Sequence, residues 1–380
     1  MKNTNRYTPL FFRIVLASTL IGSAYSFSED PTEIDGDLKQ VIHTPEEFIK
    51  DDSMYYLDFS ARSTTRFRAE NFNDAKDRER LQQRVTLQLQ ATIKGGWKII
   101  GIAQSGPAFR SGYDTLYDSR ETDNRFTTDN FTENYSVRRL YVEGDLSEDV
   151  SVQLGAIPVE RGLNSDIVSL STNGWINGGR LKMETEKLGK VTIVAGTLGE
   201  TDEVNAFKRD TRLDYIEVNI QQEVYENLLA EVGYEKHQDD EFFKFATNYE
   251  LETASQKAVK FLAEGLIDIN SGKTKAAISA RADLGNLFNG QDSGVTFEIR
   301  QAYLSEGFSS RGVDYTSGFN NANNDERGAY GIYILRSRFD SNYSNNFLNW
   351  LTEDSSWYTR MRHEYVTGEF TYEAGFQKKF

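Results

Sequence analysis

Arginine is the residue type in this sequence whose spacing could most directly do chemistry, because it recurs at alternate positions in separate segments. The segment ARSTTRFR, residues 61–68, carries Arg62, Arg66 and Arg68. A guanidinium group stays charged at physiological pH and donates paired hydrogen bonds to carboxylates or phosphates. Such a row could bind or steer charged solutes without any covalent step.

The elements that must position these arginines are predicted by a period of two. In residues 54–69 the apolar side chains of Tyr55, Leu57 and Phe59 share one parity, and the arginines share the other. This alternation predicts a β-strand with one apolar and one polar face. The segment around residues 84–93 repeats the pattern. Further strands are expected near 96–105, 133–146, 149–159, 175–188, 190–199, 211–222, 225–237, 240–254, 257–269, 273–284, 293–304, 328–340, 355–366 and 368–380.

The connections between these segments favour a membrane barrel over a soluble sandwich. Short turns such as KGG, SED and LGK alternate with long connections, for example 106–132, 160–174 and 305–327. Short turns on one side and long loops on the other are typical of outer-membrane barrels. We therefore predict an all-β fold, a transmembrane antiparallel up-and-down β-barrel of about 16 strands, with about 14 to 18 compatible with the pattern.

An even number of strands lets the last strand pair with the first, which leaves no open sheet edge in lipid. This closure would gather arginines from both ends of the chain on the lumen side. It predicts a pore-lining basic arc of Arg62, Arg66, Arg68, Arg80, Arg84, Arg360 and Arg362. Across the barrel, an opposing acidic wall is expected from Glu217, Glu231 and Glu235. The two walls would create a transverse field in the lumen, or neighbouring charges would only neutralise one another.

A long connection at residues 160–174 carries more apolar surface than an exposed loop usually has. We expect it to fold into the barrel as a constriction, with Arg161, Asp166 and Ile167 as candidate residues. The alternative is a loop that lies on the rim or against a neighbouring subunit.

Three segments of different composition make up the chain. Residues 1–26 are predicted to be a signal peptide, with a basic start, a short apolar stretch and a small-residue cleavage site at 24–26. Residues 27–53 are expected to be a periplasmic lead-in with a short helix, and residues 54–380 to form the barrel. Export to the cell outer membrane follows. The sequence has no cysteine, which excludes disulfides and thiolate chemistry.

Enzymatic chemistry is poorly supported. Only His43, His237 and His363 are available as histidine bases, and none sits in a recognisable catalytic motif. No cofactor fingerprint or metal-ligand cluster is present, so we expect neither a cofactor nor a metal. The net charge of −15 disfavours nucleic-acid binding.

The ending TYEAGFQKKF, together with the apolar start and the amphipathic segments, resembles Gram-negative outer-membrane porins. Residues 78–101 and 138–162 are similar to hairpins of porins related to the phosphate-selective and alginate-export types. The resemblance implies that Tyr372, Phe376 and Phe380 form a C-terminal signal for the barrel-assembly machinery; Phe72 is not part of it. It also implies contact with outer-membrane lipid and lipopolysaccharide, and a homotrimer.

The function expected from this reading is a passive diffusion channel for small hydrophilic solutes. The main alternative is a structural or adhesive barrel whose loops close its lumen. An outer-membrane hydrolase is a much weaker alternative.

Overall fold

The fold is described by a computed structural model of the 380-residue chain. It describes residues 55–71, 77–93, 95–105, 114–119, 136–165, 168–170, 174–198, 206, 213–253, 257–283, 295–305, 308, 328–338, 355–364 and 370–379. The predicted signal peptide and lead-in, residues 1–53, lie outside this set and stay predictions.

Seventeen β-strands make up the regular structure of the described residues. The first nine are β1 (Tyr55–Asn71), β2 (Arg78–Ile93), β3 (Lys98–Gln104), β4 (Asp114–Asp118), β5 (Ser136–Ser147), β6 (Val150–Pro158), β7 (Trp175–Thr185), β8 (Gly189–Leu198) and β9 (Tyr215–Tyr225). The others are β10 (Leu228–His237), β11 (Asp240–Thr253), β12 (Lys257–Asp268), β13 (Thr274–Asp283), β14 (Val295–Leu304), β15 (Gly328–Arg338), β16 (Ser355–Glu364) and β17 (Phe370–Lys379). A helix long and apolar enough to cross a membrane does not occur in this part of the chain.

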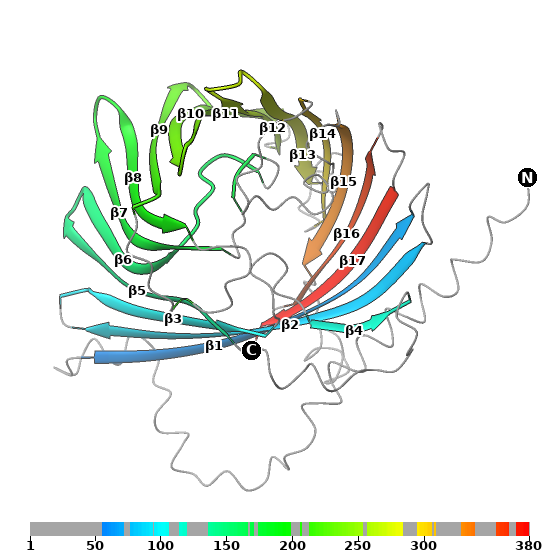
Figure 1. The fold of residues 1–380 in the computed structure, drawn as a ribbon, viewed down its shortest axis with the longest axis horizontal. Coiled ribbons are helices and arrows are strands. Elements are labelled where there is room, and N and C mark those ends of the chain that lie inside the picture. Colours follow the sequence, from blue (N-terminus) through cyan, green and yellow to red (C-terminus); the bar gives the residue numbers. More distant parts are fainter. Residues whose placement is uncertain are drawn as a thin grey trace, which may run out of the picture.

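Sixteen of the seventeen strands form a closed antiparallel ring, seen end-on in Figure 1. Each strand pairs with the next along the chain, except that β3 pairs with β5 and the short β4 pairs with β2. The ring closes where β1 pairs with both β2 and β17. The prediction of an up-and-down barrel of about sixteen strands is therefore confirmed.

Alternation along each strand separates an apolar outer face from a polar lumen. Leu57 and Phe59 on β1 and Ile278 on β13 are 66%, 63% and 62% exposed, and they share the outward parity. The inward parity of β1 carries Arg66 and Arg68, both buried. Outward apolar and inward polar residues are the arrangement of a barrel in lipid.

Two details of the strands differ from the sequence-based expectation. The predicted loop 106–132 contains the extra strand β4, whose five residues are too few for their alternation to stand out. The first two strands, 17 and 16 residues long, extend to Asn71 and from Arg78, beyond the predicted segments 54–69 and 84–93. Continuous pairing between β1 and β2 extends from Tyr55 opposite Ile93 to Glu70 opposite Arg78, which accounts for the extra length.

The connections keep the predicted asymmetry in most places. Residues 148–149, 186–188 and 226–227 are tight turns on one side of the barrel. On the other side, β6 and β7 are separated by residues 159–174, and β14 and β15 by residues 305–327. The exceptions include the short connections 238–239, 269–273 and 365–369 on the long-loop side, and the longer connections 284–294 and 339–354 on the other side.

Candidate functional site

The basic arc lies at the seam where the two ends of the sheet meet. Register places Arg68 of β1 opposite Glu373 of β17, and Arg360 of β16 opposite the same glutamate. On the other side of β1, Arg68 lies opposite Arg80 of β2. Closure of the ring therefore brings arginines from β16, β1 and β2 onto one stretch of lumen wall.

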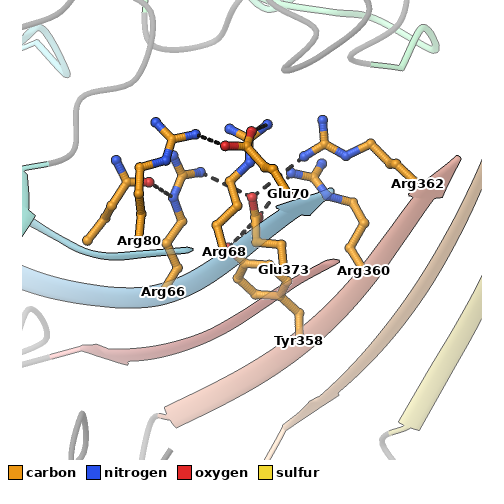
Figure 2. Close-up of polar contacts among 9 residues, drawn as sticks. Arg66, Arg68, Glu70, Arg80, Tyr358, Arg360, Arg362 and Glu373 are labelled. Atoms are coloured by element: carbon orange, nitrogen blue, oxygen red, sulfur yellow. Dashed lines mark hydrogen bonds and ion pairs between the residues drawn. The ribbon is translucent and has the colours of Figure 1, made fainter. Parts of the chain in front are cut away.

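Glu373 is the centre of this arc, and Figure 2 shows the guanidinium groups around it. Its carboxylate accepts hydrogen bonds from Arg360 Nη2 at 3.0 Å and from the Tyr358 hydroxyl at 2.9 Å. Nitrogens of Arg66 and Arg362 lie 3.5 and 3.6 Å from its Oε2 atom. Because the side chain of Glu373 is only 1% exposed, its charge is neutralised by these arginines and not by water.

A second carboxylate holds the other half of the arc. The side chain of Glu70 accepts from Arg68 Nη2 and from Arg80 Nη2, each at 2.7 Å (Figure 2). Arg66 Nε donates to Gln82 Oε1 at 3.0 Å. The arginines are therefore held in position by partners on their own strand or on a neighbouring one.

The two remaining predicted members are less enclosed. Arg62 has the inward parity but is exposed, and its register partners are Thr86 and Lys379. Arg84 is half-buried opposite Thr64. The structure brings five of the seven predicted arginines around two glutamates, and places Arg62 and Arg84 further along the same wall.

The predicted acidic wall lies on β9 and β10. Glu217 and Glu235 are opposite each other in register, and all three glutamates, including Glu231, are buried. Lys244 of β11 lies among them and forms an ion pair with Glu217. The wall is therefore partly neutralised by a buried lysine that the sequence analysis did not identify.

A glycine makes room for this lysine. Lys244 lies opposite Gly233 of β10, yet its ammonium reaches Glu217 on the strand beyond. A Cβ atom at Gly233 would lie 2.9 Å from Lys244 Cε and 2.0 Å from Asn219 Oδ1. Glu217 also accepts from Asn219 Nδ2 at 2.8 Å and from the Tyr215 hydroxyl at 3.0 Å. The missing side chain at Gly233 thus lets the lysine cross β10.

The connection 159–174, hereafter the lumenal loop, is fixed at its start by β7. Arg180 donates to the carbonyl oxygen of Pro158 at 2.5 Å and to Glu160 Oε1 at 3.0 Å. Lys182 Nζ donates to the same glutamate oxygen at 2.7 Å. Since Arg180 and Lys182 are on the inward parity, the loop leaves the strand toward the lumen.

Further along, the lumenal loop reaches inward-facing carboxylates of two strands. Glu231 of β10 accepts from the backbone nitrogen of Leu163 at 3.0 Å and from Asn164 Nδ2 at 2.8 Å. Glu264 of β12 accepts from the backbone nitrogen of Ser165 at 2.5 Å and also from its hydroxyl. The loop therefore lies inside the barrel, as Figure 1 also shows for its described part.

Apolar contacts extend from the lumenal loop to two parts of the wall. Val168 is fully buried in a cluster with residues of β11 to β14, namely Phe242, Leu266, Ala277, Ala302 and Leu304, and with Phe308. Leu170 is buried in a second cluster that includes Ile100, Tyr141, Ile157, Ile176, Val194 and Tyr215. The loop thus fills lumen space between these two regions.

Other predicted site residues are only partly described. Arg161 is half-buried at the start of the lumenal loop, where its carbonyl oxygen accepts from the Asn164 backbone nitrogen at 3.1 Å. Asp166 and Ile167 lie outside the described residues. Of the predicted C-terminal signal, Tyr372 and Phe376 have the outward parity of β17. Phe380 and Phe72 are outside the described set, and the signalling role stays a prediction.

Sequence reasoning missed Glu70, Glu373, Lys244 and Glu264. All four share the inward parity of their strands, so parity alone was a usable signal for lumen residues. Parity does not say which lumen residues meet, because that depends on strand register. No group of three or more metal-liganding side chains occurs among the residues that the structure describes.

The class that this fold defines is the transmembrane antiparallel up-and-down β-barrel. No protein-family model matches the chain, and no curated protein matches it either. Solved structures do resemble it, and they are outer-membrane porins of Gram-negative bacteria. The likeness rests on the fold.

Three of these structures illustrate the likeness. OccAB1 of Acinetobacter baumannii matches with a TM-score of 0.52 and 12% identity, over 85% of this chain and 96% of that one. OprB of Pseudomonas putida, in a low-pH structure, gives 0.55 and 10%, over 91% and 98%. OccK8 (OprE) of Pseudomonas aeruginosa gives 0.53 and 10%, over 85% and 98%. None of the three is named as a phosphate-selective or alginate-export porin, so that part of the resemblance stays a prediction.

Proposed function

We propose that this protein is an outer-membrane porin, a passive diffusion channel for small hydrophilic solutes. The observation that carries the proposal is the closed ring of strands with an apolar exterior and a charged interior. A barrel with this polarity places a polar passage across lipid. No covalent step is involved, and the side chains of the lumen act through their charge and size.

The arrangement of charge inside the barrel supports a selectivity role for the basic arc. Among the described residues of this wall, Arg66, Arg68, Arg80, Arg360 and Arg362 lie around Glu70 and Glu373, so arginines outnumber glutamates at the seam. Charges along a narrow, low-dielectric passage act on ions more strongly than charges in bulk water. We propose that the basic arc favours anionic over cationic solutes where the passage is narrowest.

Several associations belong to the same proposal. A cleaved signal peptide at residues 1–26 would direct export to the outer membrane. The outward aromatic residues of β17 would be read by the barrel-assembly machinery. Outer-membrane lipid and lipopolysaccharide would contact the apolar face, and a homotrimer is the proposed assembly state.

The test is single-channel conductance of the purified protein in a planar lipid bilayer, with selectivity read from the reversal potential under a salt gradient. Stable open steps are expected. Arg66→Gln with Arg362→Gln should move the reversal potential toward cation selectivity. Lys236→Gln is the matched control, because this lysine pairs with Glu241 on the outward parity and is not on the lumen wall.

Two results would contradict the proposal. A correctly folded barrel without conducting steps would favour the structural or adhesive barrel with a loop-closed lumen, an alternative supported by the contacts of the lumenal loop with the wall. Equal reversal potentials for the arginine variants and the unmodified protein would show that the basic arc does not determine ion selectivity. The proposal that the protein is a channel would still stand.

A further inference from the structure

We infer that Glu231 and Glu264 are positioning residues, which hold the lumenal loop across the barrel and so set the width of the passage. The inference rests on the proposed channel function. It assigns these glutamates the role of positioning the loop, and not that of supplying negative charge to the field in the lumen. Three observations carry it: the four hydrogen bonds that the glutamates accept, the absence of charge on the donors, and the anchoring of the loop at its start.

All four hydrogen bonds join the glutamates to uncharged groups of three consecutive residues. Both oxygens of Glu231 accept, one from the Leu163 backbone and one from the Asn164 amide. Both oxygens of Glu264 accept from Ser165, one from its backbone and one from its hydroxyl. A carboxylate with both oxygens bonded to the loop is directed at the loop and not at a passing solute.

The close approach of the loop to Glu231 requires a glycine at the contact. Gly162 has a φ of +60°, and a Cβ atom there would lie 2.1 Å from Glu231 Oε2. A side chain at this position would be strained by its backbone conformation and would displace the carboxylate. The loop backbone is therefore shaped to lie directly against this glutamate.

The loop is held at separate points, which makes the glutamates more than incidental contacts. Arg180 fixes its first residues, and the two glutamates fix residues 163–165. Val168 and Leu170 then pack into two different apolar clusters. Hydrogen bonds to charged groups are stronger than hydrogen bonds between neutral groups. Loss of all four would free the middle of the loop while its start stays bound to β7.

Glutamine can test position separately from charge, because this site can satisfy an amide. The Ser165 hydroxyl can accept a hydrogen bond as well as donate one. The Asn164 Oδ1 atom has no hydrogen-bond partner in the structure, so a rotated Asn164 amide could accept from a glutamine at position 231. Glutamine therefore removes both charges but keeps the bonds, whereas alanine removes charges and bonds together.

The experiment compares E231Q/E264Q with E231A/E264A, and uses Glu250→Ala as a control. Glu250 is an inward-parity carboxylate that pairs with Lys260 at 3.0 Å, and the hydrogen bonds described for the lumenal loop do not involve it. The alanine pair should roughly double the open-channel conductance and increase its noise, because the narrowest segment dominates the resistance of a pore. The glutamine pair should keep the conductance of the unmodified protein.

Trypsin gives a second readout that does not depend on conduction. Arg161 lies in the lumenal loop, and cleavage after it requires the loop to leave the wall. The alanine pair should be cut at Arg161, while the glutamine pair and the unmodified protein resist. If the double alanine variant does not fold, as judged by heat-modifiable migration on gels, Glu264→Ala alone serves the same comparison.

The outcomes separate this inference from the proposed function. Unchanged conductance and trypsin resistance in the alanine pair would overturn the positioning role. Equal changes in the glutamine and alanine pairs would assign the effect to charge and also overturn it. An unmodified barrel that never conducts would refute the channel, while the trypsin comparison would still decide whether the two glutamates hold the loop.

Discussion

The basic arc and the acidic wall face the same lumen but use their charges in different ways. In the arc, two glutamates lie among five arginines, so arginines outnumber glutamates among the described residues of this wall. On β9 to β12, the glutamates are bonded to a lysine, to neighbouring side chains or to the lumenal loop. Positive and negative residues on opposite walls of a pore therefore do not always create a transverse electric field between them.

This difference teaches that a count of lumenal charges is a poor guide to the field that a solute meets. A carboxylate bonded to two backbone or side-chain donors has little remaining capacity for a solute. An arginine has five N–H donors and can hold a structural carboxylate and still offer donors to a ligand. Any field in this lumen should thus depend more on the arginines than on the glutamates.

Removal of the carboxylate at the centre of the arc should have the largest effect. Glu373→Ala removes the shared partner of the buried Arg66 and Arg362 and of the partly exposed Arg360. We expect the free energy of unfolding to fall by about 3–5 kcal/mol, the usual result of breaking a buried pair from one side. Urea unfolding in detergent micelles, followed by tryptophan fluorescence, measures this change. A loss below about 1 kcal/mol would mean that water already solvates the arc.

Removal of the lysine from the acidic wall should come next. Lys244→Met leaves Glu217 buried beside Glu231 and Glu235, and we expect a loss of about 3 kcal/mol, at the lower end of the range for buried pairs. The loss is smaller than for Glu373 because Glu217 keeps its hydrogen bonds from Asn219 and Tyr215. The same unfolding measurement applies. The comparison between the walls would fail if this variant lost more stability than Glu373→Ala.

A methyl group in the path of that lysine should have an intermediate effect. Gly233→Ala places a Cβ atom against Lys244 and Asn219, and overpacking of this kind costs about 1–3 kcal/mol. Gly101→Ala is the matched control on β3, where the nearest atom to an added Cβ is Leu140 Cδ1 at 3.9 Å. Equal stability of the two variants would show that Lys244 does not need the space above Gly233.

The smallest effect is expected for an ion pair outside both walls. Glu250 and Lys260 are 3.0 Å apart, but their side chains are 37% and 49% exposed. Glu250→Gln should therefore lower the free energy of unfolding by no more than about 1 kcal/mol, because water screens the pair. A larger loss would mean that exposure does not distinguish peripheral from buried pairs in this barrel, and would weaken the comparison between the walls.

Much of the fold was predictable from alternation alone. The period of two in segments such as residues 84–93 predicted both the strands and the side of each residue, because one face must meet lipid and the other water. The basic arc followed from parity and closure together. Strand β4 was missed because five residues within a long connection are too few to show a sustained period.

The partners inside the lumen were not predictable, for a physical reason. Lys244 lies in the segment FFKFAT, where aromatic neighbours indicate a lipid face and say nothing of a glutamate two strands away. Its contact with Glu217 depends on register and on the space above Gly233. The destination of the lumenal loop likewise depends on Glu231 and Glu264, which lie 68 and 99 residues from their bonding partners. Contacts at such separations are set by the assembled barrel.

The pairing of β1 with β17 also bears on the order in which the chain assembles. Arg66 and Arg68 are on the first strand of the ring, whereas Glu373 is on the last. Until β17 is in place, the arginines of β1 and of β16 lack this counter-ion. Joining β17 to β1 removes the last sheet edges and brings Arg66 to the shared carboxylate in the same step. Closure of the sheet and pairing of these charges therefore take place at the same seam.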